Sequence, residues 1–468
     1  MEFEGEMLEP VSPLGQYCNS SVLSISVLAV LEIGTPIDDS QTISLIRDLL
    51  LPIHPRFSCI MVGGVNEYKK WKKVEVKIED HVHVPIFPSG LSIESYDRYF
   101  DDYVSKIALE RFPQDRPLWE IHIIKYPTSN AAGNVIFKLH HALGDGYSLM
   151  GALLCCLQRA DNPSIPLTFP SRKRTEFDGD CNRSLFSFVP KICSAIFNTA
   201  MDLSWSIIKS NLIDDEITPI RTGTYGVEFL PITITSLTLS LDQIKSIKSK
   251  LGATINDVVC GIVFYGTRLY MQEINQKSSN SRSAALMVLN TRMIGGDYKS
   301  IKEMLNPDNK MPWGNKFSFM HIAIPKLKEC PSPLDFVWHA QKIVKRKRRS
   351  LVVYLNSLLV EVVKKLRGPE AAATYVFKKL NRSSMSISNL IGPVEQMTLN
   401  NHPVKGLYFA APGIPEDYGV TIMSYSGQLR IVFKMVRKHV DPHKLKSCVQ
   451  NAFESIREAA DKFPPRKN

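Results

Sequence analysis

The stretch FKLHHALGDGYSLM, residues 137–150, carries two adjacent histidines, an aspartate and two glycines between two apolar runs. The first run reads as a strand that ends at the histidines, and the residues after Gly146 have the apolar spacing of a helix. Successive side chains of a strand point to opposite faces, so one imidazole can face a cleft while the other packs inward. We expect Gly146 to let the backbone turn sharply into the helix.

This arrangement suits proton transfer better than metal binding. A histidine at a strand end, with Asp145 close behind it, is mostly neutral at cellular pH and can take a proton from an alcohol. His140 and His141 point to opposite faces and cannot easily share one metal ion, and the following loop lacks the i, i+4 spacing of a zincin motif. The alternative is that both histidines are structural, as is common beside a glycine turn.

Strand and helix patterns are intermixed along the rest of the chain and predict a mixed α/β fold. Residues 118–125 and 134–141 both have strand character, and the segment between them contains the Pro, Ser, Asn and Gly residues of a turn. We therefore expect these two strands to form an antiparallel hairpin that leads directly into the histidines.

A polar, charged segment after residue 170 interrupts the pattern and suggests a domain boundary in this chain of 468 residues. We expect an N-terminal domain at 1–170, a linker at 171–224 and a C-terminal domain at 225–468. Within the linker, the apolar run 184–213 is interrupted by charged residues, so no 18-residue stretch is free of charge. We favour a helix that lies at a membrane interface or packs on protein over one that spans the membrane.

The net charge of +11 suggests an acidic partner such as nucleic acid, anionic lipid or a phosphate-bearing small molecule. The run KRKRR, residues 345–349, precedes apolar residues at helical spacing and predicts a basic amphipathic helix. That helix either rests on an anionic membrane surface or packs against a domain with its basic end in water. Nucleic acid fits poorly, because the sequence has no basic stripe interleaved with aromatic residues and no recognition-helix signature.

Cysteine usage and the first residues favour a protein that faces the cytosol. The nine cysteines are scattered and form no CxxC pair, which indicates neither a zinc ribbon nor a disulfide framework. The start of the chain is acidic, where a secretory signal would be basic and then apolar.

His140, His141, Asp145 and Gly146 fit the HHxxxDG pattern of CoA-dependent acyltransferases of the chloramphenicol-acetyltransferase-like superfamily. Five further segments follow the order found in one family of this superfamily: PLWE (117–120), ATINDVV (253–259), LNTR (289–292), PWGNKFS (312–318) and SNLIGP (388–393). Over nearly its whole length, the chain resembles the plant wax ester synthase/diacylglycerol acyltransferases.

This resemblance implies two chloramphenicol-acetyltransferase-like domains, each a mixed β-sheet flanked by helices, with an active-site channel at their interface. In such a fold, His141 is the general base that removes a hydroxyl proton from a long-chain alcohol or diacylglycerol as the oxygen attacks the acyl-CoA thioester. The resemblance gives His140 a packing role and Gly146 the turn of the motif. It gives Asp145 a structural role through a salt bridge to Arg292.

The resemblance also implies roles for two further groups of residues. Pro117, Leu118 and Trp119 would lie near the acyl or alcohol path, and Asn256 and Asp257 would open a helix that faces the site. The alternative for all five is core packing or helix capping.

The implied partners are acyl-CoA as co-substrate and a fatty alcohol or diacylglycerol as acceptor, with no metal ion and no bound cofactor. The implied location is the cytosolic face of the endoplasmic reticulum membrane, with the plasma membrane as the alternative. Two other functions stay open: a non-catalytic lipid-binding or membrane-surface protein of the same fold, and acyl transfer to a small hydroxylated metabolite. The intact set of His141, Asp145 and Gly146 argues against the first of these.

Overall fold

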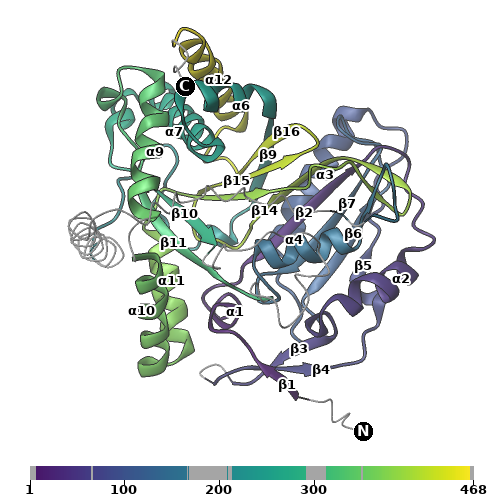
Figure 1. Cartoon of the computed structure of the whole chain (residues 1–468). Coiled ribbons are helices and arrows are strands. Elements are labelled where there is room, and N and C mark those ends of the chain that lie inside the picture. The colour runs from purple at the N-terminus through teal and green to yellow at the C-terminus, as the bar shows by residue number, and fades with distance from the viewer. Residues whose placement is uncertain are drawn as a thin grey trace, which may run out of the picture.

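Two mixed β-sheets form the framework of the molecule (Figure 1). The computed structural model describes residues 7–64, 67–165, 167, 208, 213–290, 313–348 and 352–463. The apolar run at 184–213 and most of the expected linker fall outside the described residues. A smaller third sheet consists of β1 (Met7–Pro10), β4 (Lys70–Lys73) and β3 (Cys59–Val62). The mixed α/β class predicted from the sequence is confirmed.

The N-terminal sheet has seven strands. In spatial order they are β5 (Val82–His83), β6 (Trp119–Ile124), β7 (Gly133–His140), β2 (Ser26–Ile33), β14 (His402–Ala410), β13 (Met397–Leu399) and β8 (Gln158–Arg159). The predicted antiparallel hairpin is confirmed as β6 and β7. All eight residues of β2 are buried, because strands pair with both of its edges and apolar clusters cover both of its faces.

The C-terminal sheet has six strands. In spatial order they are β11 (Phe317–Ala323), β10 (Ala284–Asn290), β12 (Met385–Ile391), β15 (Tyr418–Tyr425), β16 (Gln428–Val436) and β9 (Ile232–Ser240). β12 runs parallel to both β10 and β15, and the remaining pairs are antiparallel. Ser426 and Gly427, with φ of 46° and 75°, form the tight turn between β15 and β16.

β13 and β14 come from the second half of the sequence but pair within the N-terminal sheet. β14 lies between β2 and β13 and is antiparallel to both. The expected boundary before residue 225 therefore does not coincide with the division between the two sheets, since β13 and β14 lie after it in the sequence. A strand pattern does not identify the partner strand, so the sequence could not show this pairing. An ion pair between Glu32 on β2 and Arg430 on β16 adds a second tie between the sheets.

Helices of the first half cover both faces of the N-terminal sheet. They are α1 (Pro13–Tyr17), α2 (Thr42–Leu45), α3 (Ile93–Leu109) and α4 (Gly146–Cys155), with the short helices η1 (Ile46–Leu50), η2 (Leu51–Ile53), η3 (Pro55–Ser58) and η4 (Ile78–His81). Apolar residues of α3 pack on one face, and those of α4 and η1 pack on the other (Figure 1). The helix predicted after the histidines is therefore confirmed as α4.

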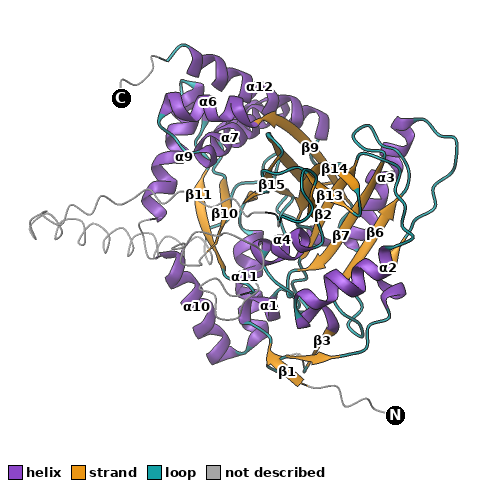
Figure 2. Ribbon diagram, turned by 45° about the vertical axis from the view of Figure 1, so that its right-hand side comes forward, coloured by secondary structure: helices purple, strands orange, loops and turns teal. Residues whose placement is uncertain are grey.

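Helices of the second half are α6 (Leu241–Leu251), α7 (Ile255–Ile274), α9 (Pro333–Arg348), α10 (Val352–Arg367), α11 (Pro369–Asn381) and α12 (Pro442–Asp461), with η6 (Val227–Phe229), η7 (Gln276–Asn280) and η8 (Leu327–Glu329). α6, α7, α9 and α12 pack on one face of the C-terminal sheet (Figure 2). α11 and α1 together cover the other face at β10. These two helices come from opposite halves of the chain, so they form part of the interface between them.

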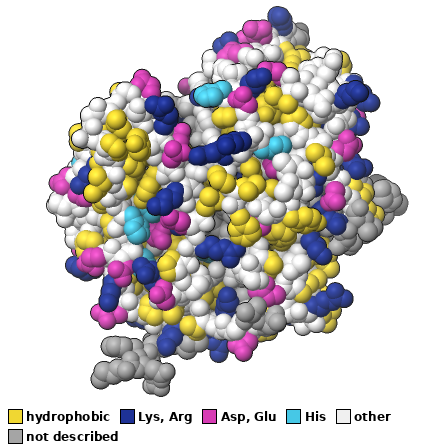
Figure 3. Space-filling view, turned by 180° about the vertical axis from the view of Figure 1, so that it is seen from behind, with side chains coloured by type: hydrophobic (Ala, Val, Ile, Leu, Met, Phe, Trp, Pro, Cys, Tyr) yellow, Lys and Arg dark blue, Asp and Glu magenta, His cyan; other side chains and the backbone are white. Residues whose placement is uncertain are grey.

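The single basic amphipathic helix predicted after residue 345 is two helices. The basic residues at 345–348 end α9, whereas the apolar run that follows belongs to α10. No helix within the described part of the chain is long and apolar enough to cross a membrane. On the face seen in Figure 3, Lys and Arg side chains are dispersed among acidic and apolar ones.

Candidate active site

His140, the last residue of β7, is fully buried. Its Nδ1 accepts a hydrogen bond from the amide of Ala142 at 3.0 Å, and its Nε2 lies 3.3 Å from the hydroxyl of Ser24. Because Nδ1 accepts, the ring proton is on Nε2. Burial, with a smaller contribution from His141, lowers the pKa of His140 to about 3. The inward packing predicted for His140 is confirmed.

His141 turns the other way and is partly exposed. Its Nδ1 lies 3.0 Å from Oδ1 of Asn315, and the amide nitrogen of Asn315 donates to the main-chain oxygen of His141 at 2.9 Å. The second bond fixes which end of the Asn315 amide faces the ring, and an amide oxygen can only accept. Nδ1 of His141 is therefore the donor, and Nε2 carries no proton. An unprotonated Nε2 is what a general base needs.

The surroundings of His141 keep its ring neutral. Burial lowers the pKa of His141 below its usual value, and the Asp145 carboxylate and the hydrogen bond to Asn315 offset only part of this effect. The ring of Phe317 meets the His141 ring edge-on, with 5.1 Å between the ring centroids. A neutral imidazole beside an apolar wall can accept a proton from a hydroxyl group.

Asp145 joins the histidine loop to a segment from the other half of the chain. It is the N-cap of α4, where Oδ1 accepts from the amide of Ser148 at 3.0 Å. Oδ2 accepts from the amide of Lys316 at 2.8 Å. These bonds give Asp145 a structural role. Its expected partner Arg292 lies outside the described residues.

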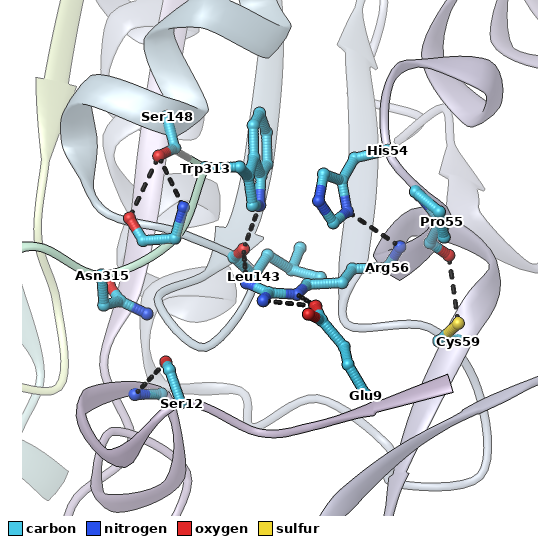
Figure 4. A network of polar contacts seen from close by, with 12 residues as sticks. Glu9, Ser12, His54, Pro55, Arg56, Cys59, Leu143, Ser148, Trp313 and Asn315 are labelled. Carbon is cyan, nitrogen blue, oxygen red and sulfur yellow. Dashed lines mark hydrogen bonds and ion pairs between the residues drawn. The ribbon is translucent and has the colours of Figure 1, made fainter. Parts of the chain in front are cut away.

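Two hydrogen bonds join the hydroxyl of Ser148, drawn in Figure 4, to the main chain of Gly314. The Ser148 hydroxyl donates to the main-chain oxygen of Gly314 at 3.0 Å and accepts from the Gly314 amide at 3.1 Å. Gly314 has a φ of 124°, which side-chain-bearing residues rarely adopt. The conformation of Gly314 thus lets segment 313–316 pass close to the start of α4, which brings Asn315 to His141.

A second set of bonds holds the loop between the two histidines and α4. The main-chain oxygen of Leu143 accepts from Nε1 of Trp313 at 2.8 Å and from Nη1 of Arg56 at 3.1 Å (Figure 4). Arg56 also forms an ion pair with Glu9 at 2.5 Å. The ring of His54 stacks on Trp313, with 4.7 Å between centroids. The loop is therefore held by two segments, η3 and 313–316.

Gly146 is needed for space and not for a special backbone conformation. Its φ lies outside the positive range that favours glycine. A Cβ at this position would lie 3.0 Å from Cδ1 of Leu390 on β12. The turn predicted for Gly146 therefore does not use a left-handed backbone, and the approach of Leu390 leaves little room for a side chain at this position.

Pro117, Leu118 and Trp119 are all buried in the N-terminal half. Leu118 and Trp119 belong to the apolar cluster beneath α4, and Nε1 of Trp119 donates to the main-chain oxygen of Phe57 at 2.8 Å. The Trp119 ring also stacks on His81, with 4.2 Å between centroids. Core packing accounts for these contacts, and the substrate-path role implied by the resemblance stays a prediction.

Asn256 and Asp257 lie at the start of α7 as expected. Asp257 and Thr254 form a reciprocal capping box, with hydrogen bonds of 2.9 and 3.2 Å. Asn256 accepts a hydrogen bond of 3.1 Å from the side chain of Asn389 on β12. Capping explains Asp257, and Asn256 ties α7 to the strand that also carries Leu390.

A cavity of about 430 Å³ lies against the residues that contact His141. Asn315 and Phe317 form one wall, so the cavity begins next to the histidine. The opposite walls come from α1, α10 and α11. Leu358 and Lys316 are exposed, so the cavity opens to solvent at these residues.

Asn315, Ser148, Gly314 and Arg56 were not predicted as site residues from the sequence. The segment PWGNKFS, which the resemblance singled out, contains Gly314 and Asn315, but nothing in its sequence shows that Asn315 fixes the tautomer of His141. No local pattern singles out Arg56 or Ser148, since their roles depend on contacts with distant parts of the chain.

The fold consists of two mixed sheets, linked by strands β13 and β14 of the second half, and of a histidine loop held by segment 313–316. Family models agree: the wax ester synthase/diacylglycerol acyltransferase catalytic domain matches residues 65–259, and the WS/DGAT C-terminal domain matches residues 313–457. The chain belongs to the wax ester synthase/diacylglycerol acyltransferase family and is an acyltransferase.

Relatives match over nearly the whole chain. Wax ester synthase/diacylglycerol acyltransferase 11 of Arabidopsis thaliana is 29% identical, over 96% of this chain and 95% of its own length. Wax ester synthase/diacylglycerol acyltransferase 4 of the same plant is 28% identical, over 98% and 92%.

Solved structures share the fold at low sequence identity. The wax ester synthase/diacylglycerol acyltransferase from Marinobacter aquaeolei VT8 superposes with a TM-score of 0.57 at 14% identity and covers 97% of this chain and 100% of its own. The first condensation domain of the CDA synthetase gives a TM-score of 0.55 at 12% identity, with coverage of 94% and 91%.

Proposed function

We propose that this chain transfers a long-chain acyl group from acyl-CoA to the hydroxyl of a fatty alcohol, of diacylglycerol, or of both. The observation that carries the proposal is the pairing of His141 with Asn315, which leaves Nε2 unprotonated. Asn315 and Phe317, which contact His141, also line an open cavity. The family supports acyl transfer to an oxygen, and the relatives' names supply the two acceptor classes.

In the proposed reaction, Nε2 of His141 takes the hydroxyl proton while the acceptor oxygen attacks the thioester carbonyl carbon. The tetrahedral intermediate then collapses, the carbon–sulfur bond breaks, and the thiolate of CoA leaves and takes up the proton from the imidazolium. No covalent enzyme intermediate is needed. Positioning of the two substrates makes the larger contribution and lowers the activation barrier by about 7–11 kcal/mol. General-base catalysis by His141 raises the rate by a further ~10²–10⁴-fold.

We also propose that the reaction takes place at a membrane surface, on the cytosolic face of the endoplasmic reticulum. Leu358, Val362 and Leu366 of α10 are 59%, 41% and 79% exposed and recur every four residues, so they form one apolar stripe. Lys365 and Arg367 lie beside this stripe, as suits an anionic bilayer. Substitution of Val362 and Leu366 by Ser should abolish co-sedimentation with anionic vesicles, and unchanged sedimentation would reject α10 as the contact.

Two alternatives make different predictions. A non-catalytic lipid-binding protein of the same fold has no use for an unprotonated Nε2, so it would give no product with any acceptor. An acyltransferase for small hydroxylated metabolites would use the same base but reject long-chain acceptors.

The test is a product assay with purified protein, labelled acyl-CoA, and either a fatty alcohol or diacylglycerol. We expect ester from at least one acceptor and loss of ester formation in His141→Ala. His443→Ala, which removes an exposed histidine of α12, is the matched control and should keep full activity. Unchanged turnover in His141→Ala would exclude His141 as the base, and no product from either acceptor would reject the proposed substrates.

A further inference from the structure

Lys379 of α11 is a buried cation that lines the cavity beside the candidate base. It is only 4% exposed. Within the described residues, its ammonium has neither a hydrogen bond nor an ion pair, although lysine is almost never buried without a partner. Burial, reinforced by the nearby charge of Lys347, lowers the pKa of Lys379 to about 8.

Other charges around the cavity do not compensate for Lys379. Among its described lining residues, the cations are Arg56, Lys316 and Lys379, and the one acid is Glu361. Glu361 already lies 3.6 Å from Lys364. The Arg56 guanidinium is paired with Glu9, which leaves Lys379 as the buried cation of the lining for which no described acid compensates.

The walls restrict what kind of anion fits. Apolar and aromatic side chains make up much of the lining, among them Tyr17, Phe319 and Tyr375. A volume of about 430 Å³ holds more than a single small ion. The chemistry therefore suits an anionic group carried on a less polar arm, which is the character of an organic phosphate.

We propose that the cavity between α1, β11 and α11 binds the phosphate end of the acyl-CoA donor, with Lys379 as the ion that receives it. This inference rests on the proposed function for the identity of the donor. A phosphoryl group on a lipid headgroup shares the same chemistry, so the experiment has to distinguish the two sources. The site also gives a physical reason for a buried lysine in a cavity, since the ligand supplies the missing counter-charge.

The experiment measures binding of CoA to the whole chain by isothermal titration calorimetry, which requires no turnover. Lys379→Met keeps the length of the side chain and removes its charge, and Lys378→Met changes its exposed neighbour on the same helix. We expect Lys379→Met to weaken CoA binding by about ten- to hundredfold, since one hydrogen bond to a charged group is lost. Lys378→Met should bind CoA like the parent, and Lys379→Arg should recover part of the affinity.

Pantetheine, which lacks the phosphates, identifies the group that Lys379 receives. Its binding should be the same in the parent and in Lys379→Met. Equal losses for pantetheine and CoA would overturn the phosphate assignment, and so would CoA binding that Lys379→Met leaves unchanged. Binding to phosphatidic acid vesicles that depends on Lys379 while CoA binding does not would also overturn it, in favour of a lipid headgroup.

The melting temperature controls for folding. Lys379→Met removes a buried charge, so it should melt at or above the parent temperature. If CoA binds through Lys379 but no acceptor yields ester, the proposed function fails and the anion site stands. If ester forms and Lys379→Met changes neither Kd nor KM for the donor, the anion site fails and the function stands.

Discussion

The surroundings of His141 and of Lys379 are opposite in kind, although Lys379 and two residues that contact His141 line the same cavity. Around His141, hydrogen bonds within the protein fix the arrangement: Asn315 holds the ring, and Asp145 and Ser148 hold the two segments together. Lys379 is buried with no acidic partner in the described part of the chain. The comparison teaches that the fold itself orients His141, whereas the counter-charge of Lys379 would come from a bound ligand.

Asp145→Ala should have the largest effect on the hydrogen-bonded surroundings of His141. It leaves the amides of Ser148 and Lys316 without their carboxylate, and we expect a loss of about 2–4 kcal/mol in the free energy of unfolding. Segment 313–316 also carries Asn315, which orients His141, so the rate of acyl transfer should fall as well. Urea unfolding and the product assay measure the two effects.

Asp441→Ala is the matched control for this change. Asp441 caps α12 and also accepts from two main-chain amides, those of His443 and Lys444. Its loss should lower stability by about 1–2 kcal/mol and leave turnover of the folded enzyme unchanged. If both variants lose activity in proportion to stability alone, the link from Asp145 to the base is wrong.

Asn315→Ala separates orientation of the base from folding. The ring of His141 loses its fixed tautomer, so kcat should fall on the order of 10–100-fold with little change in KM. Asn134→Ala removes another buried Asn, which lies at the opposite end of β7 from the histidines and donates to Thr128 at 3.5 Å, and should leave kcat unaltered. An unchanged kcat in Asn315→Ala would contradict the assigned tautomer.

The pH dependence should reveal a base with a lowered pKa. Burial outweighs the opposing effects of Asp145 and Asn315, so the folded-state pKa of His141 lies below 6.5. The neutral, active form is therefore kept as the pH falls to 6.5 and is lost only on further acidification through the folded-state pKa. A profile of kcat/KM whose acid limb has its midpoint above 6.5 would exclude this environment for the base.

Gly146→Ala should have the smallest effect and tests how closely the two halves approach. The added methyl group meets Leu390, and we expect a loss of about 1–2 kcal/mol in unfolding free energy. In the background of Leu390→Ala, the same change should be nearly neutral. A double-mutant cycle in urea measures this coupling, and full additivity would mean that the contact is absent.

The strand and the helix that flank the histidines could be predicted from the sequence, because each depends on a pattern of neighbouring residues. Strand alternation up to His140 and helical spacing after Gly146 each depend on neighbouring residues, and both elements are present as β7 and α4. The opposite orientations of the two histidines follow from the same alternation.

The partner of the base could not be predicted in this way. Asn315 lies 174 residues along the chain from His141, and only the paired sheets bring the two together. The strand exchange of β13 and β14 was missed for the same reason, since pattern does not specify a distant partner. The buried state of Lys379 was equally hidden, because it follows a second lysine on a helix that reads as amphipathic.

The central claim is that the free enzyme holds Nε2 of His141 unprotonated. Nitrogen-15 NMR of the histidine rings at pH 7, with His141 assigned through the His141→Gln variant, reads this directly. We predict a proton on Nδ1 and none on Nε2, with the two tautomers mixed in Asn315→Ala. A proton on Nε2 in the active parent enzyme, or a charged ring at this pH, would contradict the account.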